Sequence, residues 1–469
     1  PIIDLTLILI LSMDQHPGSK MSDMVHNDIW QKVIDANIIN KPCDKMTKKF
    51  IIDFCLDCTE HYIMKNITDI TDLGSEKCFL LACMFCDNVN VIKYMTESED
   101  LKLDVKCTNV NGSNSLMLAC GSNKNLEIIR FLIEDLGMNI NQRNKYGNNC
   151  LALACYENTN FEIIKYLIED QKMDIGHTNN FGYKCLMLAC EKNINLKIIK
   201  YLIEDLWISV NHTDINGSNC LMEACGGNKN LEIIKYLIND QKMNINHMKK
   251  NGKNCLLLAC WKNTNLEIIK YLINDQKMNI NHTDNNGDNC LTLACYQNTN
   301  LEIVKYLMES EDLEMNIDHI DKSGNNCLLS ACMKNTNLEI IKYLVECKKM
   351  NINQRNYSGK RCLLLACWEN TNLEIIKYLI EGQRMSINQT DNLWRNCLLL
   401  ACQNNTNLEI IKYLIEDQRM SVNQTDKDGH NCLTLACFSN TNPEIIQYLI
   451  ENQGNKIDIQ INKISSKSW

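Results

Sequence analysis

Between residues 254 and 273 the chain reads Asn-Cys-Leu-Leu-Leu-Ala-Cys-Trp-Lys-Asn-Thr-Asn-Leu-Glu-Ile-Ile-Lys-Tyr-Leu-Ile. The apolar block from Cys255 to Cys260 predicts a short helix. Asn254 precedes this block, and its amide oxygen can accept a hydrogen bond from a free N–H group of the first helical turn. We therefore expect a helix that begins directly after Asn254.

The second block of this stretch predicts an amphipathic helix. Asn265 precedes it and recurs in the other copies, whereas Thr264 is replaced by Lys229 and Ile194, so Asn265 is the expected N-cap. In one copy Pro443 falls on the first helical position, where a missing N–H group does no harm. The predicted apolar face consists of Leu266, Ile269, Leu272 and Ile273.

The stretch recurs through most of the chain in steps of 35 residues, with two steps of 37. A fixed period of this size indicates a repeat architecture in which each unit packs on its neighbours. Most of the 27 cysteines belong to the recurring block, so they mark a repeat rather than a disulfide framework. In eleven successive units the first position of the block is held by Cys78, Ser115, Cys150, Cys185, Cys220, Cys255, Cys290, Cys327, Cys362, Cys397 and Cys432.

A polar segment such as Met278 to Gly287 joins consecutive helix pairs. It contains the β-branched Ile280 among polar residues and a glycine near its end, which predicts a short extended arm that turns back on itself. Tetratricopeptide units also pair helices at a similar period, but they lack the recurring Asp-x-x-Gly turn of this segment.

The chain resembles the ankyrin-repeat family. The segment from Asp284 to Cys295 has the Asp, Gly, Leu and Ala of the family's Asp-x-x-Gly-x-Thr-Pro-Leu-His-x-Ala-Ala, with Asn in place of Thr and Cys in place of Pro. The segment Leu266 to Ile273 is similar to the family's second helix. Two one-residue insertions, one after Cys260 and one after Asp275, account for a unit longer than the family's roughly 33 residues.

The resemblance covers roughly residues 76 to 451 and implies an all-α repeat solenoid of ankyrin-type helix pairs with protruding β-turn arms, in about eleven 35-residue units. We expect a tail or non-native leader at 1–20, an N-terminal helical cap at 21–74, the ankyrin-repeat solenoid at 75–460 and a C-terminal tail at 461–469. The abundance of Asn, Ile and Lys in nearly identical copies is similar to ankyrin-repeat proteins of large DNA viruses that infect amoebae.

The net charge, the apolar segments and the cysteine content indicate which kinds of partner and which cellular compartment to expect. The net charge of −9 argues against nucleic acid, because phosphate binding needs a basic face. The apolar run Leu5–Leu11 is too short to span a bilayer, so no membrane association is expected. The many thiols imply a reducing compartment, and we expect a cytoplasmic protein, in the host cell if it is viral.

The sequence predicts no enzyme, no cofactor and no metal site. It has no phosphate-binding Gly-x-x-x-x-Gly-Lys, no Gly-x-Gly-x-x-Gly and no Gly-x-Ser-x-Gly. Cys55, Cys58 and His61 have one metal-like spacing, whereas zinc sites need two such pairs. One histidine recurs in five arms, at His177, His212, His247, His282 and His319. Because the repeat spacing places them too far apart to share a metal ion, we expect a solvated ladder of histidine side chains rather than a set of metal ligands.

The resemblance implies a protein–protein interaction scaffold that binds a partner, a host protein, in the concave groove of the solenoid, with the scaffold itself a monomer. Two alternatives are open. The chain can be a substrate adaptor for a host ubiquitin ligase, although no F-box-like segment is found. It can also be a substrate of an asparaginyl hydroxylase, whose target place in the arm is held by Asn141, Asn211, Asn246, Asn281, Asn353, Asn388 and Asn423.

Within the family, the residues after the paired alanines and around the turn glycine face the groove. The first of these places is unusually rich in aromatic residues, which binding sites favour. The expected partner-binding rings are Tyr156, Trp261, Tyr296, Trp368 and Phe438, with the alternative that they pack inward on the adjoining arm. The arm residues expected to complete the groove are Arg143, Tyr146, Lys249, Lys250, Arg355, Tyr357 and Trp394.

Overall fold

The computed structural model of the protein describes residues 75–98 and 103–452. The expected leader, the expected N-terminal cap, the expected C-terminal tail and the Cys55, Cys58 and His61 spacing all lie outside these residues. The chain divides into two compact units, with the boundary between Lys145 and Tyr146. Each unit is described by itself.

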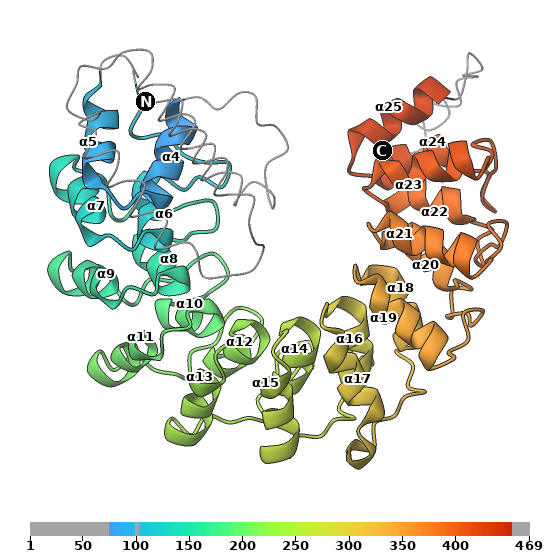
Figure 1. The fold of residues 1–469 in the computed structure, drawn as a ribbon, viewed down its shortest axis with the longest axis horizontal. Coiled ribbons are helices and arrows are strands. Elements are labelled where there is room, and N and C mark those ends of the chain that lie inside the picture. Colours follow the sequence, from blue (N-terminus) through green and yellow to red (C-terminus); the bar gives the residue numbers. More distant parts are fainter. Residues whose placement is uncertain (1–74, 99–102, 453–469) are drawn as a thin grey trace, which may run out of the picture. The chain divides into compact units, whose positions relative to one another are not determined.

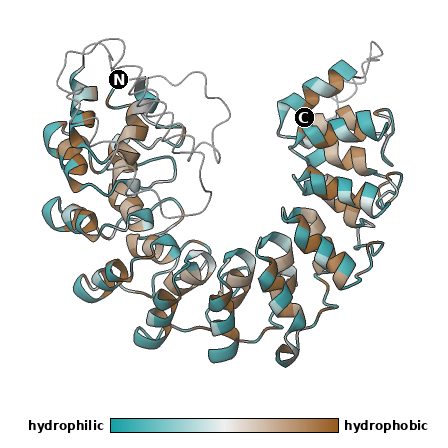
Figure 2. Ribbon diagram, viewed as in Figure 1, coloured by the Kyte–Doolittle hydropathy of each residue, from teal (hydrophilic) through white to brown (hydrophobic). Residues whose placement is uncertain are grey.

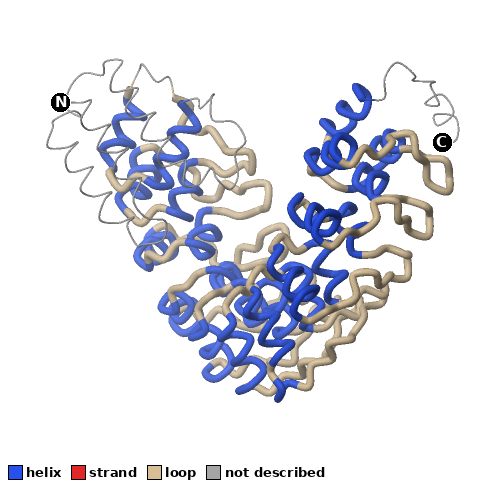
Figure 3. The backbone as a smooth tube through the Cα atoms, turned by 45° about the vertical axis from the view of Figure 1, so that its right-hand side comes forward, coloured by secondary structure: helices blue, strands red, loops and turns tan. Residues whose placement is uncertain are grey.

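The described residues form a succession of helix pairs, and no β-strand occurs among them (Figure 3). The predicted all-α repeat architecture is therefore confirmed. The first helices of the pairs are α4 (Ser75–Phe85), α6 (Ser115–Ser122), α8 (Cys150–Glu157), α10 (Cys185–Lys192), α12 (Cys220–Gly227), α14 (Cys255–Lys262), α16 (Cys290–Gln297), α18 (Cys327–Lys334), α20 (Cys362–Glu369), α22 (Cys397–Asn404) and α24 (Cys432–Ser439).

The second helices begin as α-helices and follow the first ones after a short link. They are α5 (Val89–Glu97), α7 (Leu126–Arg130), α9 (Phe161–Lys165), α11 (Leu196–Lys200), α13 (Leu231–Lys235), α15 (Leu266–Lys270), α17 (Leu301–Glu309), α19 (Leu338–Lys342), α21 (Leu373–Lys377), α23 (Leu408–Lys412) and α25 (Pro443–Asn452). Eight of them continue into a π-helical turn, namely Phe131–Asp135, Tyr166–Asp170, Tyr201–Asp205, Tyr236–Asp240, Tyr271–Asp275, Tyr343–Cys347, Tyr378–Gly382 and Tyr413–Asp417, and Glu311–Leu313 forms a 3-10 turn.

Asparagine side chains start both helices of a typical pair, as predicted. The Asn254 side chain accepts from the N–H group of Leu257, and the Asn265 side chain accepts from that of Glu267. These bonds satisfy donors that have no partner inside the helix. Pro443 is the first residue of α25, as the sequence also predicted.

The π-helical turn is how the chain absorbs the extra residue after Asp275. The N–H group of Gln276 donates to the carbonyl of Tyr271, five residues back, at 3.0 Å, and Lys277 then takes the left-handed conformation with φ +54°. A single inserted residue produces such a widened turn without breaking the helix. The repeat that contains α17 is one of the longer ones. There α17 stays α-helical to Glu309 without a π-helical turn, and Glu314 is the residue in the left-handed conformation.

Apolar side chains fill the space within and between pairs. In the second unit the first helices form one row and the second helices form another (Figure 1), and successive first helices pack together more closely than successive second helices. Figure 2 shows hydrophobic residues along the helices and hydrophilic residues on their outer turns. The predicted face of the second helix was too narrow, since Ile268 and Tyr271 are buried as well, while Leu266 is only half-buried.

The motif cysteines meet across each interface of the second unit. Cys155 lies beside Cys185 and Cys190 beside Cys220, so the second cysteine of one unit faces the first cysteine of the next. Hydrogen bonding and burial raise the pKa of Cys155 well above its usual value. The described cysteines are free thiols, and nearly all those of the motif are buried, as expected for small core residues.

A buried asparagine joins consecutive units at the end of each first helix. The amide nitrogen of Asn263 donates to the carbonyl of Cys225 at 2.9 Å and to that of Asn228 at 2.7 Å, both in the preceding unit. Its amide oxygen accepts from the N–H group of Asn265 at 2.9 Å. The same bridge recurs at Asn193, Asn228, Asn298, Asn335, Asn370, Asn405 and Asn440.

Candidate functional site

Each arm ends in a tight turn that its first residue organises. The Asp284 carboxylate accepts from the N–H groups of Asn286 at 2.8 Å and Asp288 at 3.0 Å, and Gly287 closes the turn with φ +84°. An acidic or amide side chain can make this local turn, and glycine tolerates the left-handed conformation. The recurring Asp-x-x-Gly of the sequence is this turn.

Backbone hydrogen bonds join the tips of successive arms in the second unit. The N–H group of Asn285 donates to the carbonyl of Asn251, that of Lys322 to Asn286, and that of Tyr357 to Ser323, each at 2.9 Å. The loops at the tips therefore run side by side (Figure 3), and their residues are held in a fixed order. We call this row of turns the arm-tip edge.

The arm histidines hydrogen-bond to the preceding turn of the arm-tip edge, whereas the sequence predicted a ladder of solvated side chains. Nε2 of His282 lies 2.9 Å from the carbonyl oxygen of Gly252 in the preceding unit, and Nε2 of His247 lies 2.8 Å from that of Gly217. The rings are half-buried. The same bond is made by His177, His212 and His319.

Most of the exposed large apolar side chains in the described residues lie on the arms. In the second unit two groups of them stand at the turns of the arm-tip edge, while Met248, Ile317 and Ile320 lie on the arms between these groups. The first group is Tyr146, Phe181 and Ile215, in which the rings of Tyr146 and Phe181 stack with their centroids 6.4 Å apart. The second group is Tyr357, Leu393 and Trp394, in which Tyr357 and Trp394 are 67% and 62% exposed.

Trp394 occupies a position that is otherwise kept for glycine. The equivalent turn residues Gly359 and Gly429 have φ +79° and +86°, and Trp394 has φ +62°. A non-glycine residue in the left-handed region costs roughly 1–2 kcal/mol. A large ring that is both strained and exposed does not serve the packing of the unit.

Sequence reasoning found Tyr146, Tyr357 and Trp394 but missed Phe181, Ile215 and Leu393. The sequence contains the signal for all three, because each lies inside the turn of its arm. Phe181 is in an Asn-x-x-Gly turn, Ile215 is in an Asp-x-x-Gly turn, and Leu393 is in the turn where Trp394 replaces the glycine. Of the other arm residues, Arg355 and Lys250 are exposed along the same edge, and Arg143 is exposed in the first compact unit. Lys249 is half-buried, with Nζ 3.7 Å from the Glu223 carboxylate.

The predicted rings at the ends of the first helices lie half-buried, except Phe438, which is 55% exposed. The Trp261 ring covers Nζ of Lys253 at 5.1 Å from the ring centroid, and the Trp368 ring covers Nζ of Lys360 at 4.4 Å. Tyr156 lies beneath Lys192 at 5.0 Å, and Tyr296 is half-buried without a ring contact of this kind among the described residues. The two indoles therefore pack on the end of their own arm.

The lysines under these indoles are buried and paired with the next unit. Lys253 makes an ion pair with Asp284, and Nζ of Lys360 lies 3.8 Å from the Asp391 carboxylate. Burial lowers the pKa of Lys360 from its usual value, with the charge of Arg395 acting in the same direction. The indoles shield these pairs from water, so they have a structural role in addition to any contact with a partner.

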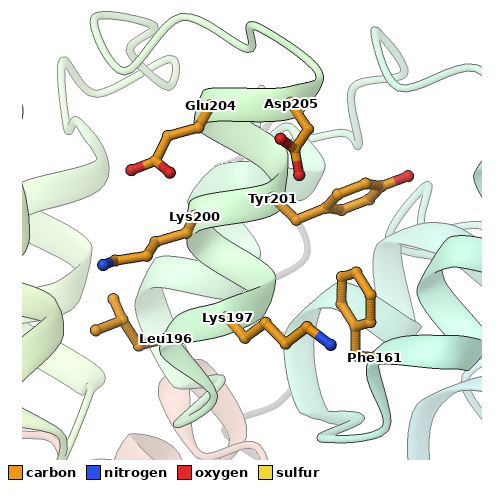
Figure 4. A pocket seen from close by; sticks show the side chains of 7 residues that line it. All are labelled: Phe161, Leu196, Lys197, Lys200, Tyr201, Glu204 and Asp205. Atoms are coloured by element: carbon orange, nitrogen blue, oxygen red, sulfur yellow. The ribbon is translucent and has the colours of Figure 1, made fainter.

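A shallow pocket of about 310 Å³ lies on the second-helix side at α11 (Figure 4). Nζ of Lys197 lies 4.0 Å from the centroid of the Phe161 ring, and the Tyr201 ring meets Phe161 edge-on at 5.0 Å. Phe161 replaces the usual leucine and Lys197 the usual glutamate of this position. The two replacements contact each other, and none of the predicted site residues lines the pocket.

One group of potential metal ligands occurs among the described residues, at Asp426, Asp428 and His430, whose ligand atoms lie within 4.8 Å of one another. Asp426 already accepts from the backbone N–H groups of Asp428 and His430 as the first residue of its turn. The group is thus the ordinary arm turn. Within residues 75–98 and 103–452 no helix has the length and apolar character needed to cross a bilayer.

The seven arm asparagines named as hydroxylase targets are all exposed. Their modification stays a prediction, because exposure permits it without requiring it.

The sequence matches the family model described as "Ankyrin repeats (3 copies)" over residues 79–179, 151–248, 186–284, 221–318, 257–356, 313–391 and 363–463. These overlapping matches cover far more than half of the chain. No curated protein matches it.

Proposed function

Because the chain belongs to the ankyrin-repeat family, we propose that it is a non-catalytic scaffold that binds a partner protein along its arm-tip edge and the adjoining ends of its first helices. The observation that carries the proposal is the gathering of exposed apolar side chains on the arm-tip edge, above all Tyr357, Leu393 and Trp394. Grouped apolar side chains on an otherwise polar surface mark interaction sites.

The fixed order of the tips supports this proposal. Hydrogen bonds between successive turns hold the exposed side chains in place before a partner arrives, so little conformational entropy is lost on binding. The strain at Trp394 also supports it, since glycine at this position, as in the other units, would be easier to accommodate. Both features favour a preformed recognition surface.

The composition resembles ankyrin-repeat proteins of large DNA viruses, and we infer on that basis that the partner is a host protein in the cytoplasm and that the scaffold acts as a monomer. Delivery of this partner to a ubiquitin ligase is a narrower hypothesis. Co-purification of ligase subunits with the captured partner would support that hypothesis, and capture of the partner without them would count against it.

The test compares partner capture by immobilised full-length chains that differ at one tryptophan. Trp394→Gly restores the glycine of the other units, and Trp207→Lys restores the lysine of the equivalent units at an 85% exposed site on the second-helix side. A hot-spot tryptophan contributes about 2 kcal/mol or more, so Trp394→Gly should weaken capture at least tenfold. Trp207→Lys should leave capture unchanged.

Quantitative mass spectrometry of the proteins retained from cells that express the chain naturally provides the measurement. Trp207→Lys should unfold at nearly the native temperature, because Trp207 is exposed. Trp394→Gly should unfold at the native temperature or slightly above it, because Trp394 is also exposed and glycine relieves the left-handed strain. Equal retention of every partner by the two variants would show that the arm-tip edge is not the binding surface.

A further inference from the structure

The second exposed apolar group lies on adjoining turns of the arm-tip edge. Tyr357 belongs to one turn, and Leu393 and Trp394 belong to the next. The backbone N–H group of Asn392 donates to the carbonyl of Ser358 at 3.0 Å, and its side-chain amide nitrogen donates to the carbonyl of Tyr357, also at 3.0 Å. These bonds hold the two turns that carry the apolar side chains next to each other.

The Tyr357 ring is seated on the turn before its own. A Cβ atom added to Gly324 would approach the ring to 2.8 Å, closer than such atoms come in folded proteins, so only glycine leaves room for the ring there. The N–H group of Tyr357 donates to the carbonyl of Ser323 in the same preceding turn, at 2.9 Å. The ring is thus supported from below while 67% of the side chain is exposed.

Exposed cations stand on both sides of this group. Arg355 lies two residues before Tyr357, and Lys427 lies in the following turn, where its N–H group donates to the carbonyl of Leu393 at 2.9 Å. Neither the Arg355 guanidinium nor the Lys427 ammonium has a hydrogen-bonding or ion-pair partner among the residues that the structure describes. Lys322, in the turn before Tyr357, is also exposed, and its ammonium donates to a backbone carbonyl rather than to a carboxylate.

The carboxylates of the same turns do not balance these cations. Asp391 is 4% exposed and already pairs with Arg395, with Nη2 at 2.7 Å. Asp426 is buried and accepts from backbone N–H groups of its own turn. Asp428 is the exposed acidic residue of the turns that carry the group and Lys427. The surface around the apolar group is therefore locally positive, on a chain whose net charge is −9.

We propose that this surface binds a segment of a partner polypeptide in which acidic residues flank aromatic or aliphatic ones. The apolar side chains of the segment would pack on Tyr357, Leu393 and Trp394, and its carboxylates would pair with Arg355 and Lys427. Grouped exposed apolar side chains mark binding surfaces, and complementary charge selects and orients the partner. The proposal rests on the proposed function, because it specifies the chemistry of the partner that the arm-tip edge would bind.

The distribution of charge favours a polypeptide over a nucleic acid strand. Cations and exposed rings together can also hold single strands, but a strand needs a basic path that follows its backbone. The cations here do not continue along the edge, because the turn before that of Lys322 presents the neutral Asn285 and Asn286. Two or three cations around an apolar group suit a few carboxylates.

The test of the charges uses the fluorescein-labelled hexapeptide Glu-Leu-Glu-Glu-Phe-Glu, with its binding to the full-length chain followed by fluorescence anisotropy. The double variant Arg355→Thr with Lys427→Asn introduces the residue types of Thr390 and Asn392, which hold the equivalent places in their unit. Binding should weaken about fivefold or more through the loss of two exposed ion pairs. The fold should be unchanged, because both side chains are exposed.

A matched control removes the same charges from equivalent places on other arms. Arg143→Thr with Lys250→Asn should weaken peptide binding less than about twofold, since neither residue adjoins the second apolar group. Equal binding by the native chain and the Arg355→Thr/Lys427→Asn variant would overturn the proposal. An equal loss in the two double variants would also overturn it, because it would reveal a general response to net charge.

The apolar contacts are tested with the same peptide. Trp394→Gly should weaken binding about tenfold or more, the usual size of a lost aromatic anchor. Phe181→Asn removes an exposed ring of the first group, where other units have an asparagine such as Asn216, and should leave binding unchanged. Retention of full binding by Trp394→Gly would show that the peptide is held by charge alone and would contradict the proposed surface.

Two further probes test the chemistry of the occupant. The peptide Lys-Leu-Lys-Lys-Phe-Lys keeps the apolar residues and reverses the charges, so it should bind at least about tenfold more weakly than the acidic peptide. Fluorescein-labelled oligothymidylate should bind more weakly as well. Tighter binding of oligothymidylate than of the acidic peptide, lost in the Arg355→Thr/Lys427→Asn variant, would assign the surface to nucleic acid instead.

These outcomes separate the acidic segment from the proposed function. If natural partners are lost in Trp394→Gly but retained at full strength by Arg355→Thr/Lys427→Asn, the scaffold function stands and the acidic segment is wrong. If the acidic peptide depends on Arg355, Lys427 and Trp394 while Trp394→Gly and Trp207→Lys retain the same natural partners, the peptide site stands and capture of the partner by the arm-tip edge is wrong.

Discussion

At the scale of single residues, the asparagine at the end of each first helix is the main polar link between units. Asn263 is 2% exposed, and both of its polar side-chain atoms are hydrogen-bonded: the amide nitrogen donates twice and the oxygen accepts once. A carbonyl buried without a donor is costly, and two carbonyls of the preceding unit depend on this one side chain. The link between units is therefore sensitive to a change at one residue.

Asn263→Ala should lower the free energy of unfolding by about 2–4 kcal/mol, since it leaves those two carbonyls without a partner. Urea unfolding followed by far-UV circular dichroism measures the change. Thr264→Ala is the matched control, because Thr264 is exposed and only its backbone takes part in a bridge, so the shift should stay within about 0.5 kcal/mol. A loss no larger than that of the control would mean that water replaces the amide at this interface.

The candidate site was predictable only in part at this scale. The recurring turn motif locates the arm positions, and Trp394 was among the residues predicted from it. The same motif does not predict that the Trp261 ring covers Lys253. This contact depends on the ion pair between Lys253 and Asp284 of the next unit, which holds the lysine side chain under the indole.

At the scale of elements, the end of the second helix distinguishes this chain from a shorter unit. The π-helical turn leaves the residue after it in the left-handed conformation, as at Lys277, Lys242 and Lys172, whereas one unit uses Gly137 there. The location of the insertion could be predicted by counting residues against the family motif. Its conformation could not, because an added residue can widen a turn, form a bulge or lengthen the loop at similar energies.

Lys277→Gly should raise the free energy of unfolding by about 1 kcal/mol, because glycine adopts φ +54° without the clash that lysine suffers. Lys270→Gly, inside α15, should lower it by about 1 kcal/mol through the low helix propensity of glycine. Chemical denaturation of the two variants side by side gives the measurement. Destabilisation by both would show that the lysine at 277 makes a contact worth more than its strain.

At the scale of the whole molecule, each described helix pair makes its main contacts with the pairs before and after it within its compact unit. In the second unit α22 packs on α20 and α24, and α24 packs on α22 and α25. Stability then becomes a sum over units and interfaces rather than a property of one central core. The repeat period made this organisation predictable, because only stacking can bury an apolar face that recurs at equal intervals.

Removal of residues from Asn388 onward should leave the remaining units folded. The truncation takes away α22 to α25, so the helical signal in far-UV circular dichroism should fall by roughly a fifth while the thermal transition stays cooperative. The melting temperature should decrease modestly, since α20 loses its cover by α22. Loss of the whole helical signal would be incompatible with stability that is additive along the array.

The short reach of these contacts also bears on how the chain folds during its synthesis. The bridging hydrogen bonds of Asn335 reach back at most 40 residues, little more than one unit. At about 5–20 residues per second a ribosome needs roughly 2–7 s to extend the chain by one unit, whereas helices form within about a microsecond. Each unit after the first therefore emerges next to a neighbour that has had time to fold, and the apolar face that it turns toward that neighbour is covered before the following unit exists.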